Sequence, residues 1–496
     1  MSRATTVPVS HPEALYIGGA WVAPSTDARI DVIDAGTEEV AFSVPEATAA
    51  DMARAVDAAR VAFDDGPWPQ LTHAERAEHI RALGAAMFER NDALAQIWPR
   101  ESGVTFSTAQ FSGLIAQAGF ESYAALADTF PFEERLEPPM SPFGMLVREP
   151  VGVVGAIIPW NAPLSLIVMK LGPALLAGCS VVLKLSPEAP GEGYILAEAA
   201  EAAGLPAGVV NVVTADREVS ELLVTNPGVD KITFTGSTAA GRRIGALCAE
   251  RVARCTLELG GKSAAVVLDD ADIAAAAESI ASAECMLAGQ VCASLTRVVV
   301  NRSRHDEMVE ALAEHFAQVK VGDQFDESTQ MGPLAMSRQR DRVESYIQKG
   351  IDEGATLAAG GGRPKHLDRG WFIEPTVFAN VDNSSSIAQE EIFGPVLSVI
   401  PAEDERDAVR IANDTIYGLN ASVFTPDVDR ARETAGRIRS GTVGHNGFKA
   451  EFGMPFGGFK QSGIGREGGK EGLLGFLESK TIILDEEPST FRGSSQ

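Results

Sequence analysis

Residues 151–185 of the chain read VGVVGAIIPWNAPLSLIVMKLGPALLAGCSVVLKL. The stretch is strongly apolar, but Pro159, Asn161, Pro163, Lys170 and Pro173 interrupt it. It therefore contains no clean run of about 18 apolar residues that could cross a membrane. A buried strand, a helix and a second buried strand explain it better, with expected ranges 151–159, 163–177 and 180–185.

The same alternation continues toward the C-terminus. Continuous apolar strands that alternate with helices indicate a parallel sheet covered on both faces. This is the doubly wound pattern, in which ligands bind at the carboxyl ends of the strands. We therefore expect a Rossmann-like α/β domain, with further helices at 191–203, 218–225 and 238–249 and strands at 208–214, 231–235 and 255–259.

A second α/β unit is expected after Gly260-Gly261, where the alternation resumes. Its predicted helices are 271–287, 305–319, 337–353, 403–414 and 428–439, and its predicted strands are 296–301 and 421–424. The N-terminal part instead predicts short strands within 15–33, with a hairpin at Gly18-Gly19, and helices at 48–63 and 72–98.

Two segments look like additions to these units. Residues 132–148 are rich in Pro and Glu and are expected to leave the core. Near the C-terminus, a helical turn at 472–479 and a strand at 480–484 are predicted. A late lone strand needs an edge to pair with, which a neighbouring subunit could supply.

Composition narrows the class of protein. A chain of 496 residues is too long for one core. Its net charge of −26 argues against nucleic acid as a partner. The five cysteines show no metal-site spacing, and the first residues show no secretory signal. We expect a cytoplasmic protein with no metal site and no membrane segment.

Cys292 and Glu258 together suggest covalent carbonyl chemistry. A single Cys is most often a small buried hydrophobe, but small residues follow Cys292 at a predicted helix-to-loop transition and leave room for a substrate. A nucleophilic Cys attacks as the thiolate, so something must lower its pKa or take its proton. Glu258 lies between two leucines at the end of a predicted strand, where partial burial would raise its pKa and suit it as a base.

Three further features could bind a reacting oxygen or a phosphate. Asn161 could donate to an oxyanion or, equally well, cap the helix at 163–177. The turn at 234–241 leads from a strand into a helix, whose first N–H groups suit a pyrophosphate, although such turns are also common without a ligand. Lys184 ends a strand of the same sheet and could reach a ribose or phosphate; an ordinary solvated lysine is the alternative.

Taken as a set, these motifs resemble the aldehyde dehydrogenase superfamily of the hydrolytic, NAD(P)-dependent kind. The resemblance covers about residues 15–484. Order and spacing match as well as residue type, which is more specific than any single motif. The matching stretches are 159–161, 234–241, 258–262, 289–292, 390–395, 455–460 and 462–463.

The resemblance implies four catalytic residues. Cys292 would attack the aldehyde to form a thiohemiacetal, and Asn161 with the Cys292 N–H would hold its oxyanion. Loss of hydride to the nicotinamide would leave a thioester, and Glu258 would activate the water that hydrolyses it. Lys170 would assist proton transfer with the base.

Domain roles and cofactor contacts also follow from the resemblance. Residues 1–131 and 151–259 would form the dinucleotide-binding domain and 260–446 the catalytic domain, while 447–470 return towards the cofactor domain. Residues 132–150 and 471–496 would be an oligomerisation arm and C-terminal strand, building a homodimer or homotetramer. The implied cofactor contacts are Ile158, Trp160, Lys184, Gly236, Ser237, Glu391 and Phe393.

The cofactor lysine is followed by an unusual sequence. The family often has Glu three residues after it, but this chain has Pro187 there and Glu188 one position later. Because a carboxylate at that place would repel a 2′-phosphate, its loss weakens the expected preference for NAD. Glycines common before the strand at 231–235 are also replaced, and Arg217 there could attract an extra phosphate while Asp216 would repel it. We expect NAD, with NADP remaining an alternative.

The substrate tunnel departs from the family at two positions. Ala162 takes a place often held by an aromatic residue, and Met169 one often held by Trp. Both changes widen the tunnel, which Val291 and Phe456 would also line. We therefore expect a bulky, uncharged aldehyde, aromatic or terpenoid-like, rather than acetaldehyde.

Two other functions compete with this one. A CoA-acylating semialdehyde dehydrogenase would pass the acyl group to CoA, but such enzymes lack the base that Glu258 would be. A non-catalytic structural relative could share the fold without the activity. Retention of Cys292, Glu258 and Asn161 argues against this second alternative.

Overall fold

An eight-stranded sheet forms the core of the first lobe in the computed structural model, which describes residues 7–451, 453–489 and 491. Five strands are parallel: β7 (Val153–Ile157), β8 (Ser180–Leu185), β9 (Val210–Thr214), β10 (Lys231–Thr235) and β11 (Arg254–Glu258). The antiparallel strands β1 (Leu15–Ile17), β2 (Ala20–Val22) and β19 (Gly463–Ile464) extend its edges. The doubly wound prediction is thus confirmed, as is the hairpin at Gly18-Gly19.

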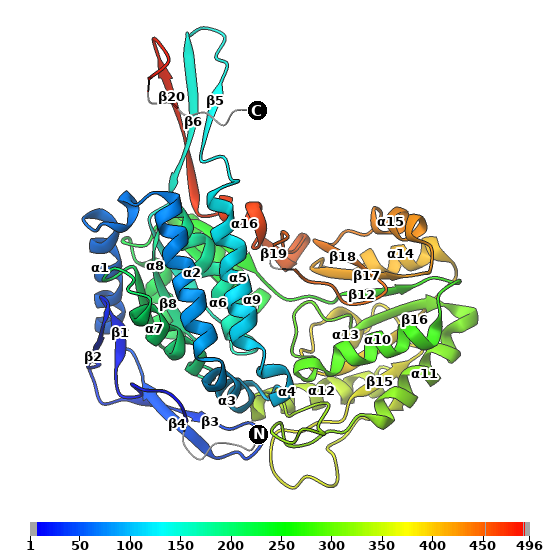
Figure 1. Ribbon diagram of the computed structural model, residues 1–496. Helices are drawn as coiled ribbons and strands as arrows, with labels where there is room; N and C mark the ends of the chain where they lie inside the picture. Colours follow the sequence, from blue (N-terminus) through cyan, green and yellow to red (C-terminus); the bar gives the residue numbers. More distant parts are fainter. Residues whose placement is uncertain (1–6, 452, 490, 492–496) are drawn as a thin grey trace.

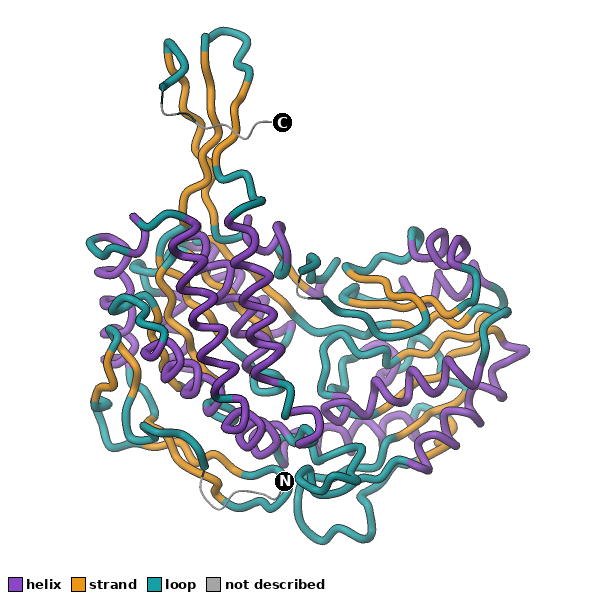
Figure 2. Tube along the Cα trace, in the orientation of Figure 1, coloured by secondary structure: helices purple, strands orange, loops and turns teal. Residues whose placement is uncertain are grey.

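Helices cover both faces of this sheet (Figures 1 and 2). One face packs against α6 (Pro163–Ala177) and α7 (Gly191–Ala202), and α2 (His73–Glu89) and α5 (Ser112–Ala124) cover the outer side of these helices. The other face packs against α1 (Ala49–Asp64), α8 (Arg217–Thr225) and α9 (Thr238–Glu250). Helix α6 is apolar nearly all round because it lies between the sheet and the outer helices.

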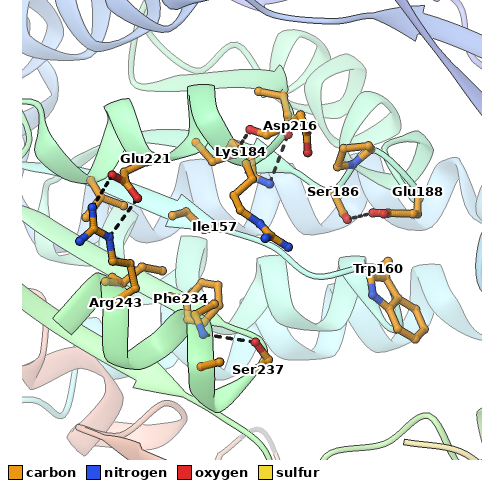
Figure 3. Close-up of a pocket in the computed structure, with 18 of the residues that line it drawn as sticks. Ile157, Trp160, Lys184, Ser186, Glu188, Asp216, Glu221, Phe234, Ser237 and Arg243 are labelled. Carbon is orange, nitrogen blue, oxygen red and sulfur yellow. Dashed lines mark hydrogen bonds and ion pairs between the residues drawn. The ribbon is translucent and has the colours of Figure 1, made fainter. Parts of the chain in front are cut away.

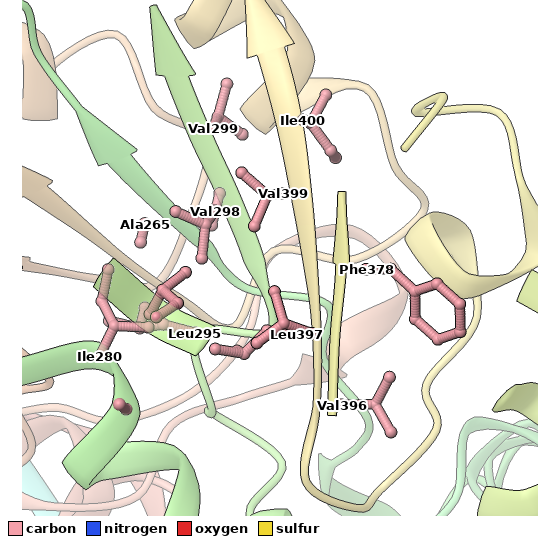
Figure 4. Packing of buried hydrophobic residues seen from close by; sticks show 14 of the residues in the cluster. Ala265, Ile280, Leu295, Val298, Val299, Phe378, Val396, Leu397, Val399 and Ile400 are labelled. Carbon is pink, nitrogen blue, oxygen red and sulfur yellow. The ribbon is translucent and has the colours of Figure 1, made fainter. Parts of the chain in front are cut away.

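The second lobe contains a seven-stranded sheet, ordered β14-β15-β16-β13-β12-β17-β18. Its valine-rich strands are buried among the helices around them, and Figure 4 shows Val298, Val299, Leu397 and Val399 in this core. The strands are β12 (Ala264–Val267), β13 (Arg297–Asn301), β14 (Thr356–Ala359), β15 (Thr376–Ala379), β16 (Val396–Ala402), β17 (Asn420–Phe424) and β18 (Thr442–His445). The helices are α10 (Ile273–Cys285), α11 (His305–Gln318), α12 (Ser337–Asp352), α13 (Ser386–Gln389), α14 (Glu405–Asn413) and α15 (Val428–Ala435).

A three-stranded ribbon projects from the first lobe (Figure 1). It consists of β5 (Glu133–Leu136), β6 (Phe143–Pro150) and β20 (Leu477–Leu484), with β6 in the middle. The expected C-terminal strand is present, and the edge that it needs comes from β6 of the same chain and not from a neighbouring subunit, since β20 pairs along its whole length with β6. The predicted helical turn also ends too late: α16 is Gly469–Leu474, and the strand begins at Leu477.

The predicted helix at 72–98 is also wrong, since the chain breaks at Arg90 into α2 and α3 (Asn91–Ser102). The Arg90 N–H closes a tight turn onto Met87 and Phe88. The Asn91 side chain then bonds Gln110 and Gly113, next to the short helix α4 (Phe106–Ala109). Because Asn91 makes these tertiary contacts, the chain forms two helices here and not the single long helix that the apolar pattern suggested.

Smaller elements complete the described part of the chain. The hairpin β3 (Arg29–Ile33) and β4 (Val40–Pro45) lies outside both large sheets. Within these residues, none of the helices combines the length and apolarity needed to cross a membrane. The ends of the predicted terminal segments, residues 1–6 and 492–496, lie outside the described residues.

Candidate functional site

The two sheets meet where β11 ends and β12 begins. Glu258 is the last residue of β11, and Gly260-Gly261 carries the chain across. A Cβ on Gly261 would lie 2.2 Å from the carbonyl oxygen of Cys292, so this crossing and the cysteine loop are in direct contact. The structure thus brings Glu258 and Cys292, from different lobes, to one junction.

An unusual backbone leads into Cys292. After α10 the chain forms a short 3-10 turn, Met286–Gly289, in which Leu287, Ala288 and Gly289 all have positive φ. A Cβ on Gly289 would lie 2.4 Å from the Gly394 backbone, so only glycine fits there. The buried Gln290 amide bonds Leu287 O at 2.9 Å and the Ala335 N–H at 3.0 Å, which fixes the loop.

The Cys292 thiol is protonated in this state. Burial raises its pKa to about 12, and the charges of Glu391 and then Glu258 add to the effect. The backbone N–H groups of Ala293 and Cys292 act in the opposite direction. Of the two requirements given above, a lowered pKa is not what this burial provides, so attack requires a base that removes the proton.

Asn161 lies against the cysteine loop. Its amide nitrogen donates to the Gln290 carbonyl at 2.9 Å, and its backbone carbonyl accepts from Trp98 Nε1 at 2.9 Å. Helix α6 has Ala162 at its N-cap with no side-chain cap, and a Glu192 oxygen binds the Leu164 N–H instead. The alternative of Asn161 as a helix cap is therefore wrong. The amide nitrogen carries two hydrogens, and this bond to Gln290 uses one of them.

Glu258 is more deeply buried than expected, with 2% exposure. Neither of its carboxylate oxygens has a hydrogen-bond partner among the described residues. Burial raises its pKa well above the usual range, and Glu467 raises it further, while Lys170 and Arg466 oppose this effect. A buried carboxylate without partners is costly to keep, which is typical of a functional group and not of a structural one.

Lys170 lies in the same buried region. Its ammonium is 2.5 Å from a Glu467 oxygen and 2.6 Å from Thr235 Oγ1, and the Lys170 and Glu467 side chains are almost fully buried. Sequence reasoning missed Glu467, which lies 297 residues further along the chain. Nothing in its local sequence distinguishes it, because only the fold brings it to Lys170.

A pocket of about 480 Å³ opens at the carboxyl ends of the parallel strands in the first lobe (Figure 3). Trp160, Lys184 and Ser237 line it, as predicted. Ser237 caps α9 by accepting from the Ala240 N–H at 3.3 Å, and burial lowers the pKa of Lys184 to about 8. A helix N-terminus and a lysine in one pocket suit a pyrophosphate.

Two predicted contacts, Ile158 and Gly236, are not among the residues that line this pocket. Ile157, and not Ile158, faces the pocket, since neighbouring residues on a strand point to opposite faces; Ile158 lies in the core. Gly236 precedes the helix cap, and a Cβ there would lie 2.5 Å from the Phe234 ring. Gly236 could therefore contact a cofactor only through its backbone atoms.

Glu391 and Phe393 lie beyond Trp160. The rings of Phe393 and Trp160 meet edge to face, with centroids 5.3 Å apart. A Glu391 oxygen accepts from the Gly261 N–H at 3.1 Å, beside the contact with Cys292. These contacts connect the pocket to the thiol loop, so a ligand extended along the pocket would point one end at Cys292.

The side of the thiol loop away from this pocket is apolar. Ala162 and Val291 pack against a cluster that includes Trp98 and Leu287. Met169 is buried in α6. Phe456 lies beside Glu467, since the Phe456 N–H donates to the Glu467 carbonyl at 2.6 Å.

Comparison with known proteins agrees with this geometry. Residues 21–482 match the aldehyde dehydrogenase family, and the chain belongs to that family. It is 46% identical to geranial dehydrogenase of Castellaniella defragrans over 95% of this chain and 98% of that protein. It is 41% identical to a 3-succinoylsemialdehyde-pyridine dehydrogenase of Pseudomonas sp., over 94% and 98%.

A solved structure is equally similar. The Mycobacterium tuberculosis aldehyde dehydrogenase complexed with NAD+ superposes with a TM-score of 0.93 at 46% identity, covering 97% of this chain and 99% of that one. The protein is therefore an oxidoreductase of the aldehyde dehydrogenase family with an α/β fold.

Proposed function

We propose that this enzyme oxidises an aldehyde to a carboxylic acid through a covalent intermediate on Cys292, which water then hydrolyses. The observation that carries this proposal is Glu258, a buried carboxylate that has no hydrogen-bond partner in the described part of the chain and whose charge acts on the Cys292 thiol. A base beside the thiol serves hydrolysis by water. It is not needed if CoA accepts the acyl group.

The first half of the reaction centres on Cys292. As its proton leaves to a neighbouring base, sulfur bonds to the aldehyde carbon and the carbonyl oxygen becomes an oxyanion. The second amide hydrogen of Asn161 and the Cys292 N–H would donate to that oxygen. When bound, the nicotinamide dinucleotide supplies the acceptor for the hydride that leaves this carbon.

The second half depends on Glu258. Its carboxylate takes a proton from water as the water oxygen attacks the thioester carbon. The carbon–sulfur bond then breaks, and Cys292 regains a proton. Lys170, held by Glu467 and Thr235, stabilises the ionised form of Glu258 by its charge.

NAD is the cofactor that the pocket supports best. The helix cap at Ser237 and the buried Lys184 suit a pyrophosphate, and the Mycobacterium tuberculosis relative was solved with NAD+. Residues 1–131 and 151–259 would bind it, and 260–446 would supply the thiol. Ile158 and Gly236 would contribute backbone contacts.

The substrate is a bulky, uncharged aldehyde, of aromatic or terpenoid type. Small Ala162 lies in an apolar wall with Trp98, Leu287 and Val291, and Met169 takes the place of a larger ring. Two relatives are named for geranial and for 3-succinoylsemialdehyde-pyridine, and these names support this class of substrate. Steady-state kinetics over an aldehyde panel test this, and a strong preference for acetaldehyde would contradict it.

Cytoplasmic location and assembly as a homodimer or homotetramer complete the proposal. The ribbon of β5, β6 and β20 exposes Met140 and Ile483, with 94% and 60% exposure. Apolar side chains on a projecting ribbon favour contact with a second subunit. Light scattering after gel filtration measures the assembly, and a monomer at all concentrations would contradict it.

Product analysis separates this function from its rivals. With aldehyde and NAD+, free carboxylic acid should form at the rate of NADH, and added CoA should change neither. Formation of an acyl-CoA thioester would establish the acylating alternative. No NADH with any aldehyde of the panel would leave only a structural role.

A further inference from the structure

An ion pair between the two lobes stands at the rim of the cofactor pocket. Glu188 follows β8 in the first lobe, and Arg338 lies in the first turn of α12 in the second. Both residues line the pocket, and the Arg338 guanidinium donates to one Glu188 carboxylate oxygen. The family resemblance gave no role to Arg338.

The two side chains of this ion pair differ in their hydrogen bonding and in their exposure to solvent. The second oxygen of Glu188 accepts from Ser186 Oγ, so both oxygens of this carboxylate are bonded (Figure 3 shows the Ser186 contact). Although burial raises the pKa of Glu188, the Ser186 hydroxyl and Arg338 together hold it below the usual value, so Glu188 is ionised. The Glu188 side chain is 21% exposed and that of Arg338 is 66% exposed. Arg338 is therefore the more exposed partner.

The pocket has a clear direction. Trp160, in contact with Phe393, marks the end near Cys292. Apolar side chains of α8 and α9, including Val224 and Leu247, line the opposite part, where an adenine ring would fit. Ser237 at the helix N-terminus suits the pyrophosphate. The adenosine ribose between them would lie beside Lys184 and the residues that follow it, where Glu188 stands.

We infer that the Glu188–Arg338 pair sets the choice between NAD+ and NADP+, an inference that rests on the proposed function. A carboxylate beside the ribose repels a 2′-phosphate, whereas a guanidinium binds it by charge-assisted hydrogen bonds. Glu188 therefore disfavours NADP+ in two ways. Its own charge repels the 2′-phosphate, and its ion pair keeps the Arg338 guanidinium from binding that phosphate. Removing Glu188 frees Arg338 for the phosphate, and removing Arg338 leaves the carboxylate unopposed.

Other charges at this pocket do not replace the pair. Arg243 is held by Glu221 through two hydrogen bonds of 2.8 and 3.2 Å. Arg217 lies next to Asp216, whose charge opposes it at the same wall. Arg243 and Glu221 also lie on α9 and α8, the part of the pocket assigned to the adenine ring, whereas Arg338 is bonded to Glu188 itself.

Calorimetric titration of the whole enzyme with NAD+ and with NADP+ tests the inference without turnover. The quantity measured is the ratio of the two dissociation constants, NADP+ over NAD+, at one ionic strength. Glu188→Gln should lower this ratio about tenfold, and Arg338→Gln should raise it about tenfold, as expected for one charge-assisted contact. The isolated nucleotide 2′,5′-ADP should bind more tightly to the first variant and less tightly to the second.

A matched control comes from the same helix. Glu344 of α12 pairs with Arg363 through two hydrogen bonds away from the pocket, so Glu344→Gln should leave the ratio within about twofold. The inference is overturned unless Glu188→Gln and Arg338→Gln move the ratio in opposite directions. It is also overturned if Arg217→Gln, and not Arg338→Gln, controls NADP+ binding. Failure of the unsubstituted enzyme to bind either dinucleotide would instead contradict the proposed function.

Discussion

The two lobes hold their parts of the site in different ways. In the first lobe, Glu258 ends a regular strand and Lys170 lies inside a regular helix. In the second, Cys292 follows a turn with three left-handed residues, and Phe393 also has positive φ. The base thus belongs to a rigid core, while the position of the nucleophile depends on a backbone that few residues allow. Substitutions should affect the two sides differently.

The largest effect is expected at the thiol itself. Cys292→Ala removes the nucleophile, so NADH formation should fall on the order of 10³-fold or more, while the enzyme still folds and binds the dinucleotide. Cys255→Ala, at a half-buried cysteine of the first lobe, is the control and should keep most activity. NADH production by Cys292→Ala at the unsubstituted rate would rule out covalent catalysis.

The irregular backbone of the thiol loop gives the next largest effect. Gly289→Ala adds a Cβ at φ +70° within 2.4 Å of the Gly394 backbone, so it should displace Cys292 and lower kcat at least about tenfold. Gly204→Ala is the matched control, since its φ is +66° but nothing lies within 4 Å. It should cost only the strain of about 1–2 kcal/mol, seen as a lower unfolding temperature with unchanged kcat. Equal loss of kcat in both variants would show that strain alone matters.

The smallest effect concerns the charges around the base. Glu258 works only when ionised, and its pKa is raised, so the rate of hydrolysis should fall as pH drops through that pKa. Glu467→Gln removes a negative charge and should move this limb of the pH profile to lower pH. Arg466→Gln removes a positive charge and should move it to higher pH, each by about one pH unit. Profiles of kcat that shift in the same direction would exclude this electrostatic account.

Sequence periodicity predicted the first lobe better than the second. The ranges of α6, β8 and β10 were predicted to the residue, because a Gly or Pro closely follows each of them: Gly178, Pro187 and Gly236. Strands β12, β14, β15, β16 and β18 were not anticipated; all of these except β16 have four residues, and such short strands carry little periodicity. The break at Arg90 was missed because it depends on tertiary contacts of Asn91.

The residues of the site also fall into those that the sequence could suggest and those that it could not. Cys292, Asn161 and Glu258 could be proposed from motifs, and the fold places all three at one junction. The pairing of Lys170 with Glu467, the pairing of Glu188 with Arg338, and the left-handed turn before Gln290 could not be proposed. Each depends on residues from distant parts of the chain, or on dihedral angles that residue type alone does not specify.

The division of labour between Cys292 and Glu258 is the central claim, and a rapid-mixing measurement of Glu258→Gln tests it most directly. If Glu258 serves mainly the hydrolysis, this variant should produce a burst of about one NADH per active site, followed by turnover slowed at least about 10²-fold. The acid-quenched protein should carry the acyl group on Cys292. A variant that shows no burst and no acyl-enzyme, but is slowed from the first turnover, would contradict the account.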